Sequence, residues 1–271
     1  MEAWRISPVA APVAGCAAEY VLESCRAGAC GAVKNKAHGM EMLVLKRRRA
    51  DFEAVIVDLD GTMVDTLGDF VQALQRMLAD LGLPGIDPGA IEAMVGKGSE
   101  HLIRSVLAHV RAQDVEALYA QAWQRYQHHY LQINGQFSRV YPGVVEGLES
   151  LRGQGLKLAC LTNKPLSFAL PLLQSKGLDV FFDQVFGGDS FARKKPDSLP
   201  LLKTCEALDS DPVRTLMLGD SSNDAQAARA AGCAVVLVSY GYNHGRPVSE
   251  VDADGVIDSL AELAVRSSPA D

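Results

Sequence analysis

Short runs of apolar residues, each followed by polar residues, recur along the chain from residue 53 onwards. These runs predict strands at 53–58, 157–161, 184–186, 215–218 and 234–238. Apolar runs bounded by turn residues are typical of strands buried in a parallel sheet. Segments with helical periodicity separate the strands, at 144–152, 168–177, 199–208 and 225–231. Strands that alternate with helices predict an α/β fold with a doubly wound parallel sheet.

A different pattern fills the segment 67–141, where apolar residues repeat every three or four positions. These repeats predict helices, one with Ser99 as its N-cap and a later one with Asp114 as its N-cap. Helices inserted directly after a single strand predict a separate small helical module. We therefore expect residues 51–66 and 142–271 to form the core and residues 67–141 to form a helical cap.

The first 50 residues differ from the rest in composition and charge. They are rich in Ala and Gly and carry a net charge of +4, which leaves −11 on the remaining residues. We expect residues 1–50 to be an extension outside the fold, either disordered or the result of a mis-annotated start. In the second case translation begins near Met40 or Met42. The basic run 46–49 is typical of a solvated flank.

The overall composition excludes several classes of protein. Hydrophobic residues make up 48% and charged residues 22% of the chain, as in soluble globular proteins. The net charge of −7 gives no indication of a nucleic-acid partner. No apolar run approaches the roughly 18 residues of a membrane span. The six cysteines include no Cys-x-x-Cys pair, so we expect reduced thiols in a cytoplasmic protein. We expect the protein to be either a monomer or a homodimer.

Polar residues follow the predicted strands at the points where the strands end. They are Asp58 and Asp60, Thr162 and Asn163, Lys194 and Lys195, and Asp220 and Asp224. In an open α/β sheet the ligand lies beyond the carboxyl ends of the strands, so we expect these side chains to meet there. Several carboxylates at one corner require a hard divalent cation, and oxygen ligands suit Mg²⁺. The pattern therefore favours phosphoryl transfer with Mg²⁺ as cofactor.

These residues also have plain structural interpretations. Asp58 could cap a turn, Thr162 could be an ordinary strand-end hydroxyl, and Asp224 could only cap the following helix. Lys194 could take the place of Lys195. The residue before a proline is biased towards an extended conformation, which favours Lys195 as the lysine with a fixed approach to the site.

Four segments resemble the motifs of the haloacid dehalogenase superfamily and occur in the order of that family. They read Asp-Leu-Asp-Gly-Thr at 58–62, Leu-Thr-Asn at 161–163, Lys-Pro at 195–196 and Gly-Asp-Ser-Ser-Asn-Asp at 219–224. The resemblance covers residues 53 to about 260. Val-Gly-Lys-Gly at 95–98 and Tyr-Pro-Gly at 141–143 are similar to phosphoglycolate phosphatases. The resemblance implies hydrolysis of a small phosphorylated metabolite, with 2-phosphoglycolate as the leading substrate.

The resemblance also implies a role for each residue of the set. Asp58 would be the nucleophile that forms an aspartyl phosphate, and Asp60 would protonate the leaving alcohol and then activate water. Thr162 and Asn163 would bind the phosphoryl group, and Lys195 would neutralise its developing charge.

A further group of residues would bind the metal and the substrate. The expected metal residues are Asp58, Asp60 through its backbone carbonyl, Asp220 and Asp224, the last as a ligand or as a group that orients the waters of the ion. Gly96 and Lys97 in the cap would contact the substrate. Lys97 could alternatively be a Schiff-base lysine, as in the phosphonate-cleaving members of the superfamily.

Other functions fit parts of the pattern. A carbon–halogen hydrolase of the same fold needs no acid two residues after the nucleophile, so Asp60 argues against it. A phosphosugar phosphatase or mutase, the second of which passes the phosphoryl group to another sugar hydroxyl, remains open. A phospho-acceptor signalling module also carries a phosphorylatable aspartate on a doubly wound sheet, but the inserted cap and Asp60 disfavour it.

Overall fold

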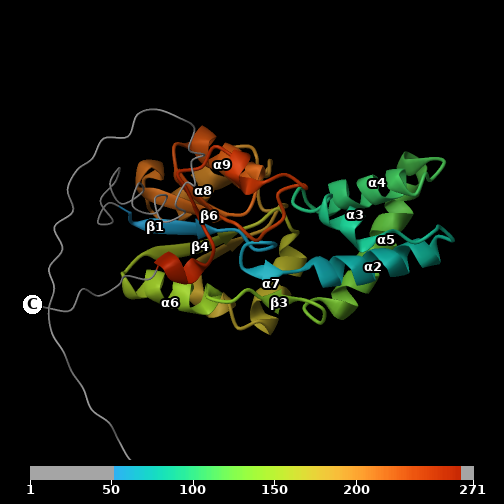
Figure 1. The fold of residues 1–271 in the computed structure, drawn as a ribbon, viewed down its shortest axis with the longest axis horizontal. Helices are drawn as coiled ribbons and strands as arrows, with labels where there is room; N and C mark the ends of the chain where they lie inside the picture. Colours follow the sequence, from blue (N-terminus) through green and yellow to red (C-terminus); the bar gives the residue numbers. More distant parts are fainter. Residues whose placement is uncertain (1–51, 264–271) are drawn as a thin grey trace, which may run out of the picture. The chain divides into compact units, whose positions relative to one another are not determined.

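The computed structural model of the protein describes residues 52–263, so the expectations for residues 1–50 lie outside the described part of the chain. A six-stranded sheet lies at the centre of the core, in the order β5-β4-β1-β6-β7-β8 (Figure 1). The strands are β1 (Ala54–Val57), β4 (Lys157–Leu161), β5 (Gln184–Phe186), β6 (Thr215–Gly219), β7 (Ala234–Val238) and β8 (Gly255–Ile257). Every neighbouring pair is parallel, which confirms the predicted fold class. The residue pattern does not predict β8, a three-residue edge strand that begins with glycine.

The side chains of β1 alternate between two hydrophobic clusters, one on each face of the sheet. Val55 and Val57 pack in the cluster that contains residues of α6 (Val144–Gly153) and α7 (Leu166–Ser175). Ala54 and Ile56 pack in the cluster that contains residues of α8 (Leu199–Ala207) and α9 (Ser222–Ala231). Figure 1 shows these two pairs of helices on opposite faces of the sheet. Because both faces of β1 are covered, its sequence is continuously apolar.

Four helices between residues 67 and 133 form the helical insertion, which is called the cap below. They are α2 (Leu67–Asp80), α3 (Pro88–Glu92), α4 (Ser99–His109) and α5 (Val115–Ile133). The cap buries a hydrophobic cluster of its own, to which the core adds Phe168 and Tyr242. Asp114 caps α5 as predicted, because its side chain accepts a hydrogen bond from the Ala117 N–H at 2.9 Å. The division of the chain at 67–141 into a separate domain stays a prediction.

Two details of the cap differ from the sequence analysis. Ser99 is not the N-cap of α4: Gly98 takes that position, and Ser99 is the first helical residue. The N-cap has φ +87°, a backbone conformation that glycine adopts far more readily than serine. Helix α3 was missed, because a helix of five residues is too short to give an apolar repeat.

The two connections between core and cap pair with each other as an antiparallel ribbon. It consists of β2 (Val64–Asp65) and β3 (Arg139–Val140), which the sequence analysis did not predict. The Tyr242 hydroxyl donates to Asp65 Oδ1 at 2.6 Å and accepts from the Thr66 N–H at 3.0 Å. A side chain of the core therefore fixes the entry of the chain into the cap.

Two further findings concern the cysteines and the hydropathy of the helices. Cys160, Cys205 and Cys233 are buried cysteines with reduced thiols. Within residues 52–263, no helix combines the length and the apolarity that crossing a membrane requires.

Substitutions of two glycines on α6 test how closely this helix packs on the short helix η5 (Leu260–Leu263). A Cβ on Gly147 would lie 2.7 Å from atoms of Leu260, whereas a Cβ on Gly153 would meet nothing within 4 Å. We expect Gly147→Ala to lower the free energy of unfolding by about 1–3 kcal/mol. Gly153→Ala should leave it unchanged or raise it by up to about 1 kcal/mol. Urea denaturation measures both values, and equal effects would contradict the close packing.

Candidate active site

Asp58 follows β1 directly, at the carboxyl edge of the sheet. Its backbone N–H donates to the Leu218 carbonyl of β6 at 2.9 Å, so the strand pairing continues up to the site. Its Oδ1 lies 3.0 Å from Lys195 Nζ and accepts a hydrogen bond from the Leu59 N–H at 2.7 Å. The structure therefore brings two predicted catalytic residues, far apart in the sequence, into direct contact.

Three buried carboxylates surround this contact. Oxygen atoms of Asp58, Asp220 and Asp224 all lie within 4.8 Å of one another. Lys195 Nζ is 2.7 Å from Asp224 Oδ1 and donates to the Leu161 carbonyl at 2.8 Å. One ammonium group among three carboxylates leaves the cluster with excess negative charge if all are ionised. This charge and the oxygen-only donor set fit a hard divalent cation.

Burial changes the proton affinities in this cluster. It raises the pKa of Asp58 to about 7, with Lys195 opposing the rise and Asp224 adding to it. Burial likewise raises the pKa of Asp220 well above its usual range, and the charges of Asp224 and Asp58 add to the rise. Burial acts to lower the pKa of Lys195, but the two neighbouring carboxylates outweigh it and the pKa lies above its usual range. Lys195 is therefore cationic, and Asp58 and Asp220 need additional positive charge to be fully ionised at neutral pH.

Gly61 allows the loop after β1 to approach Asp220. Its φ is +83°, and a Cβ on this residue would lie 2.1 Å from Asp220 Oδ2. A side chain at this position would displace either the loop or the carboxylate. Glycine is therefore needed on steric grounds at the position after the paired aspartates, because it lets the Asp220 carboxylate, which follows β6, reach the end of β1.

Asp60 makes its contacts outside the carboxylate cluster. Its Oδ1 accepts hydrogen bonds from Thr66 Oγ1 at 2.8 Å and from Lys164 Nζ at 2.9 Å. Among the described residues, the group with oxygens close enough to share a metal contains the carboxylate of Asp58 but not that of Asp60. A metal contact through the Asp60 backbone carbonyl, as the resemblance implies, stays a prediction.

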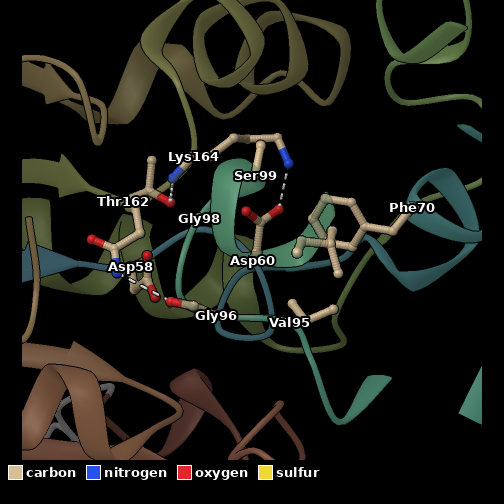
Figure 2. A pocket seen from close by; sticks show the side chains of 11 residues that line it. Asp58, Asp60, Phe70, Val95, Gly96, Gly98, Ser99, Thr162 and Lys164 are labelled. Atoms are coloured by element: carbon tan, nitrogen blue, oxygen red, sulfur yellow. Dashed lines mark hydrogen bonds and ion pairs between the residues drawn. The ribbon is translucent and has the colours of Figure 1, made fainter. Parts of the chain in front are cut away.

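A small cavity lies where the cap meets the core (Figure 2). Its lining residues are Asp58, Asp60, Thr162, Asn163 and Lys164 from the core, and Phe70, Val95, Gly96, Gly98, Ser99 and Leu102 from the cap. The volume is about 30 Å³, which accommodates about one or two water molecules. A phosphate ester is larger than this space, so a substrate needs a wider cavity than this structure contains.

One backbone carbonyl holds the loop before α4 against the core. Gly96 O accepts hydrogen bonds from Asn163 Nδ2 and Asn223 Nδ2, each at 3.1 Å. Asn163 Nδ2 also donates to the Lys195 carbonyl at 2.9 Å. Gly96 and Asn163 therefore join the cap to the loop that carries Lys195. Their predicted contacts with a substrate stay predictions.

Lys97 does not line this cavity. Its side chain is exposed and lines a separate cleft with Lys194, His101 and His244. Burial lowers the pKa of both histidines, and the charge of Lys97 adds to the effect. Of the two adjacent lysines in the motif, Lys195 forms the ion pair with Asp58. A role of Lys97 in substrate binding stays a prediction.

Thr162 and Asp224 each combine a local structural contact with a place at the site. Thr162 lines the cavity, and its Oγ1 accepts a hydrogen bond from the Lys164 N–H at 3.2 Å. Asp224 Oδ2 accepts from Ser221 Oγ at 2.9 Å in the capping box of α9, while Oδ1 pairs with Lys195. Asp224 therefore caps α9 and also pairs with Lys195, while its role at a metal ion stays a prediction.

Lys164 and Asn223 are at the site although the sequence analysis assigned them no role. Lys164 comes two residues after Thr162, and its side chain is only 1% exposed. That position at the carboxyl end of a strand was the available signal, because polar side chains there face the ligand. Asn223 directly precedes Asp224, but its partners are a backbone carbonyl of the cap and the His244 ring, which no residue pattern indicates.

A family model described as "Haloacid dehalogenase-like hydrolase" matches residues 55–238. This range contains β4, β6, all but the first residue of β1, and the four residues of the cluster around Lys195. The chain belongs to the haloacid dehalogenase-like hydrolase family. The superfamily indicated by the four motifs is therefore confirmed, and the chain is an enzyme of the hydrolase class.

Relatives within this family carry a common name. A phosphoglycolate phosphatase from Thiobacillus denitrificans is 46% identical over 214 residues, which cover 79% of this chain and 94% of the relative. "Phosphoglycolate phosphatase, plasmid" from Cupriavidus necator is 44% identical over 218 residues, covering 80% and 94%. The crystal structure of a "predicted phosphoglycolate phosphatase" from Haemophilus somnus matches with a TM-score of 0.75 at 32% identity, covering 79% and 96%. The resemblance to phosphoglycolate phosphatases is thereby confirmed.

Asn223→Ala tests the attachment of the cap to the core. The substitution removes one of the two hydrogen bonds to Gly96 O, worth about 1 kcal/mol. We expect amide hydrogen exchange in the segment 94–98 to become about fivefold faster, while exchange in β1 and β6 stays the same. Gln226→Ala is the matched control, because Gln226 is exposed on the same helix α9. Unchanged exchange in 94–98, or equal acceleration in the control, would contradict the attachment.

Proposed function

We propose that the protein is a phosphatase that hydrolyses 2-phosphoglycolate to glycolate and phosphate through a phosphorylated Asp58. The observation that carries the proposal is the buried contact of Asp58 with Lys195 inside the three-carboxylate cluster. A carboxylate beside a lysine and at the wall of a cavity is suited to nucleophilic attack on a phosphoryl group. Asp60, whose side chain lies outside the cluster, is suited to proton transfer.

The donor set of the site fits Mg²⁺. Asp58 and Asp220, with the backbone carbonyl of Asp60, would hold the ion. Asp224 already accepts hydrogen bonds from Lys195 and Ser221, and it would either ligate the ion or orient its waters. When bound, the cation would neutralise charge on the phosphoryl oxygens and on the carboxylates.

The reaction would consist of two displacements at phosphorus. In the first, a carboxylate oxygen of Asp58 bonds to phosphorus, the bond to the alcohol oxygen breaks, and Asp60 gives that oxygen a proton. In the second, Asp60 takes a proton from a water molecule while the water oxygen bonds to phosphorus. The bond between phosphorus and the Asp58 oxygen breaks, which releases phosphate and restores Asp58. Lys195 would balance negative charge in both steps, and the Thr162 hydroxyl would bind a phosphoryl oxygen.

The choice of 2-phosphoglycolate rests on the relatives and on the size of the cavity. Relatives with identities of 46% and 44% over most of this chain carry the name phosphoglycolate phosphatase. The cavity of about 30 Å³ needs less enlargement for a two-carbon ester than for a hexose phosphate. Both observations support a compact substrate, with closure of the cap excluding bulk water from the reaction.

Asp58→Asn tests the nucleophile. An amide is a poor nucleophile and cannot form the aspartyl phosphate, so we expect kcat for 2-phosphoglycolate to fall by at least about 1,000-fold. Asp209→Asn is the control, because its side chain is fully exposed and distant from the cluster. Phosphate release is the measurement, with circular dichroism to establish that both variants fold. Activity of Asp58→Asn within tenfold of the parent would exclude the proposed mechanism.

The pKa of Asp58 predicts how Mg²⁺ binding depends on pH. In the folded, metal-free protein the pKa of Asp58 is about 7, whereas in the unfolded chain it is about 4. The contribution of Asp58 to the free energy of unfolding of the metal-free protein therefore falls as pH rises from about 4 to about 7.

Mg²⁺ requires ionised carboxylates, so it should stabilise the fold mainly at the upper end of this range. We expect Mg²⁺ to raise the unfolding temperature more at about pH 8 than at about pH 5, and EDTA to abolish phosphate release. Thermal unfolding with and without Mg²⁺ at the two pH values makes the comparison. An equal shift at both values, or activity that survives EDTA, would count against the proposed metal site.

A further inference from the structure

Lys164 is the one cationic side chain among the residues that line the catalytic cavity. It follows Thr162 and Asn163 at the end of β4 and precedes Pro165, the N-cap of α7. Its side chain is 1% exposed, although a buried lysine is costly unless an anion compensates its charge. The mechanism proposed above makes no use of this residue.

Contacts from both the core and the cap surround the Lys164 ammonium group. Nζ donates to Asp60 Oδ1 at 2.9 Å, as Figure 2 shows. It also lies 4.5 Å from the ring centroid of Phe70 in α2 and 4.8 Å from that of Tyr130 in α5. Both rings attract a cation through their faces. The cap therefore helps to hold the charge in position over the cavity.

The ammonium group keeps hydrogen-bonding capacity beyond these contacts. It carries three N–H donors, and within residues 52–263 its one hydrogen-bond acceptor is Asp60 Oδ1. Lys195, by contrast, uses its donors on Asp58, Asp224 and the Leu161 carbonyl. Lys164 can therefore bind a second anion while it stays paired with Asp60.

The unused N–H donors of Lys164 lie where the carboxylate of the proposed substrate is expected. The phosphoryl group must lie against Asp58, and in 2-phosphoglycolate the ester oxygen and one methylene separate phosphorus from the carboxylate. The leaving oxygen must lie near Asp60, which is the residue that Lys164 contacts. A carboxylate one carbon beyond that oxygen falls on the side of the cavity where Lys164 lies.

We infer that Lys164 binds the carboxylate of the substrate and so makes the enzyme selective for phosphate esters of 2-hydroxy acids. The inference rests on the proposed function. In the competing interpretation Lys164 only positions Asp60, and its loss affects every phosphate ester alike. The two interpretations differ in the ratio of two substrates rather than in absolute activity.

The test compares kcat/KM for 2-phosphoglycolate with kcat/KM for 2-hydroxyethyl phosphate, in which a hydroxymethyl group replaces the carboxylate. Both substrates use the same preparation, so the ratio does not depend on the fraction of folded enzyme. We expect Lys164→Met to lower the ratio by about 10- to 100-fold, the value of a hydrogen bond to a charged group. Lys164→Arg retains the cation and should retain most of the ratio.

Lys203→Met is the matched control, because Lys203 is an exposed lysine on α8 that pairs with Glu206. It should leave the ratio unchanged. A fall in both kcat/KM values by the same factor in Lys164→Met would overturn the inference and leave Lys164 as a residue that positions Asp60. A parent enzyme that hydrolyses neither ester would instead reject the proposed function.

A binding measurement keeps the test decisive if Lys164→Met is inactive. In 3-phosphonopropionate a methylene replaces the ester oxygen of 2-phosphoglycolate, and n-propylphosphonate lacks the carboxylate. Isothermal titration with Mg²⁺ present gives the Kd of each. We expect the parent to prefer 3-phosphonopropionate by about 10-fold or more, and Lys164→Met to bind the two equally. An undiminished preference in Lys164→Met would overturn the inference.

Discussion

The buried contact of one lysine with two aspartates is the constraint on which the rest of the site depends. Lys195 Nζ lies 3.0 Å from Asp58 and 2.7 Å from Asp224, groups that come from separate connections at the edge of the sheet. Leaving one such charge without its partner costs about 3–5 kcal/mol. In the order β5-β4-β1-β6 the constraint is satisfied at the carboxyl edge of the sheet, where Asp58 follows β1, Asp224 follows the neighbouring strand β6 and Lys195 follows β5. Gly61 completes the arrangement by letting Asp220 approach.

The same geometry separates two aspartates that are only one residue apart in the sequence. Asp58 belongs to the carboxylate cluster, while Asp60 pairs with Lys164 between the core and the cap. The position of the cap therefore affects the surroundings of both aspartates. Asn163 links Gly96 of the cap to the Lys195 loop, and Phe70 of the cap contacts the Lys164 ammonium. Closure of the cap would complete both the charge balance and the enclosure of the reaction.

The fold and the carboxylate cluster were predictable from the sequence because each has a local signature. The strand at 54–57 is apolar because both of its faces are buried, and polar residues follow it at once. Contacts that depend on backbone geometry were not predictable. Ser99 had the right residue type for an N-cap, but the backbone conformation gives that position to Gly98. Lys164 had no visible partner, because the aromatic rings that surround it belong to helices of the cap far away in the sequence.

The central claim is that Asp58 accepts the phosphoryl group at the three-carboxylate cluster. A crystal structure of the protein with Mg²⁺ and beryllium trifluoride, an analogue of the phosphoryl group, tests it most directly. We expect a beryllium fluoride group bonded to a carboxylate oxygen of Asp58 and contacted by Lys195, with Mg²⁺ beside Asp220. A beryllium fluoride adduct on another residue, or Mg²⁺ bound away from Asp58 and Asp220, would contradict the role of Asp58 as the phosphoryl acceptor.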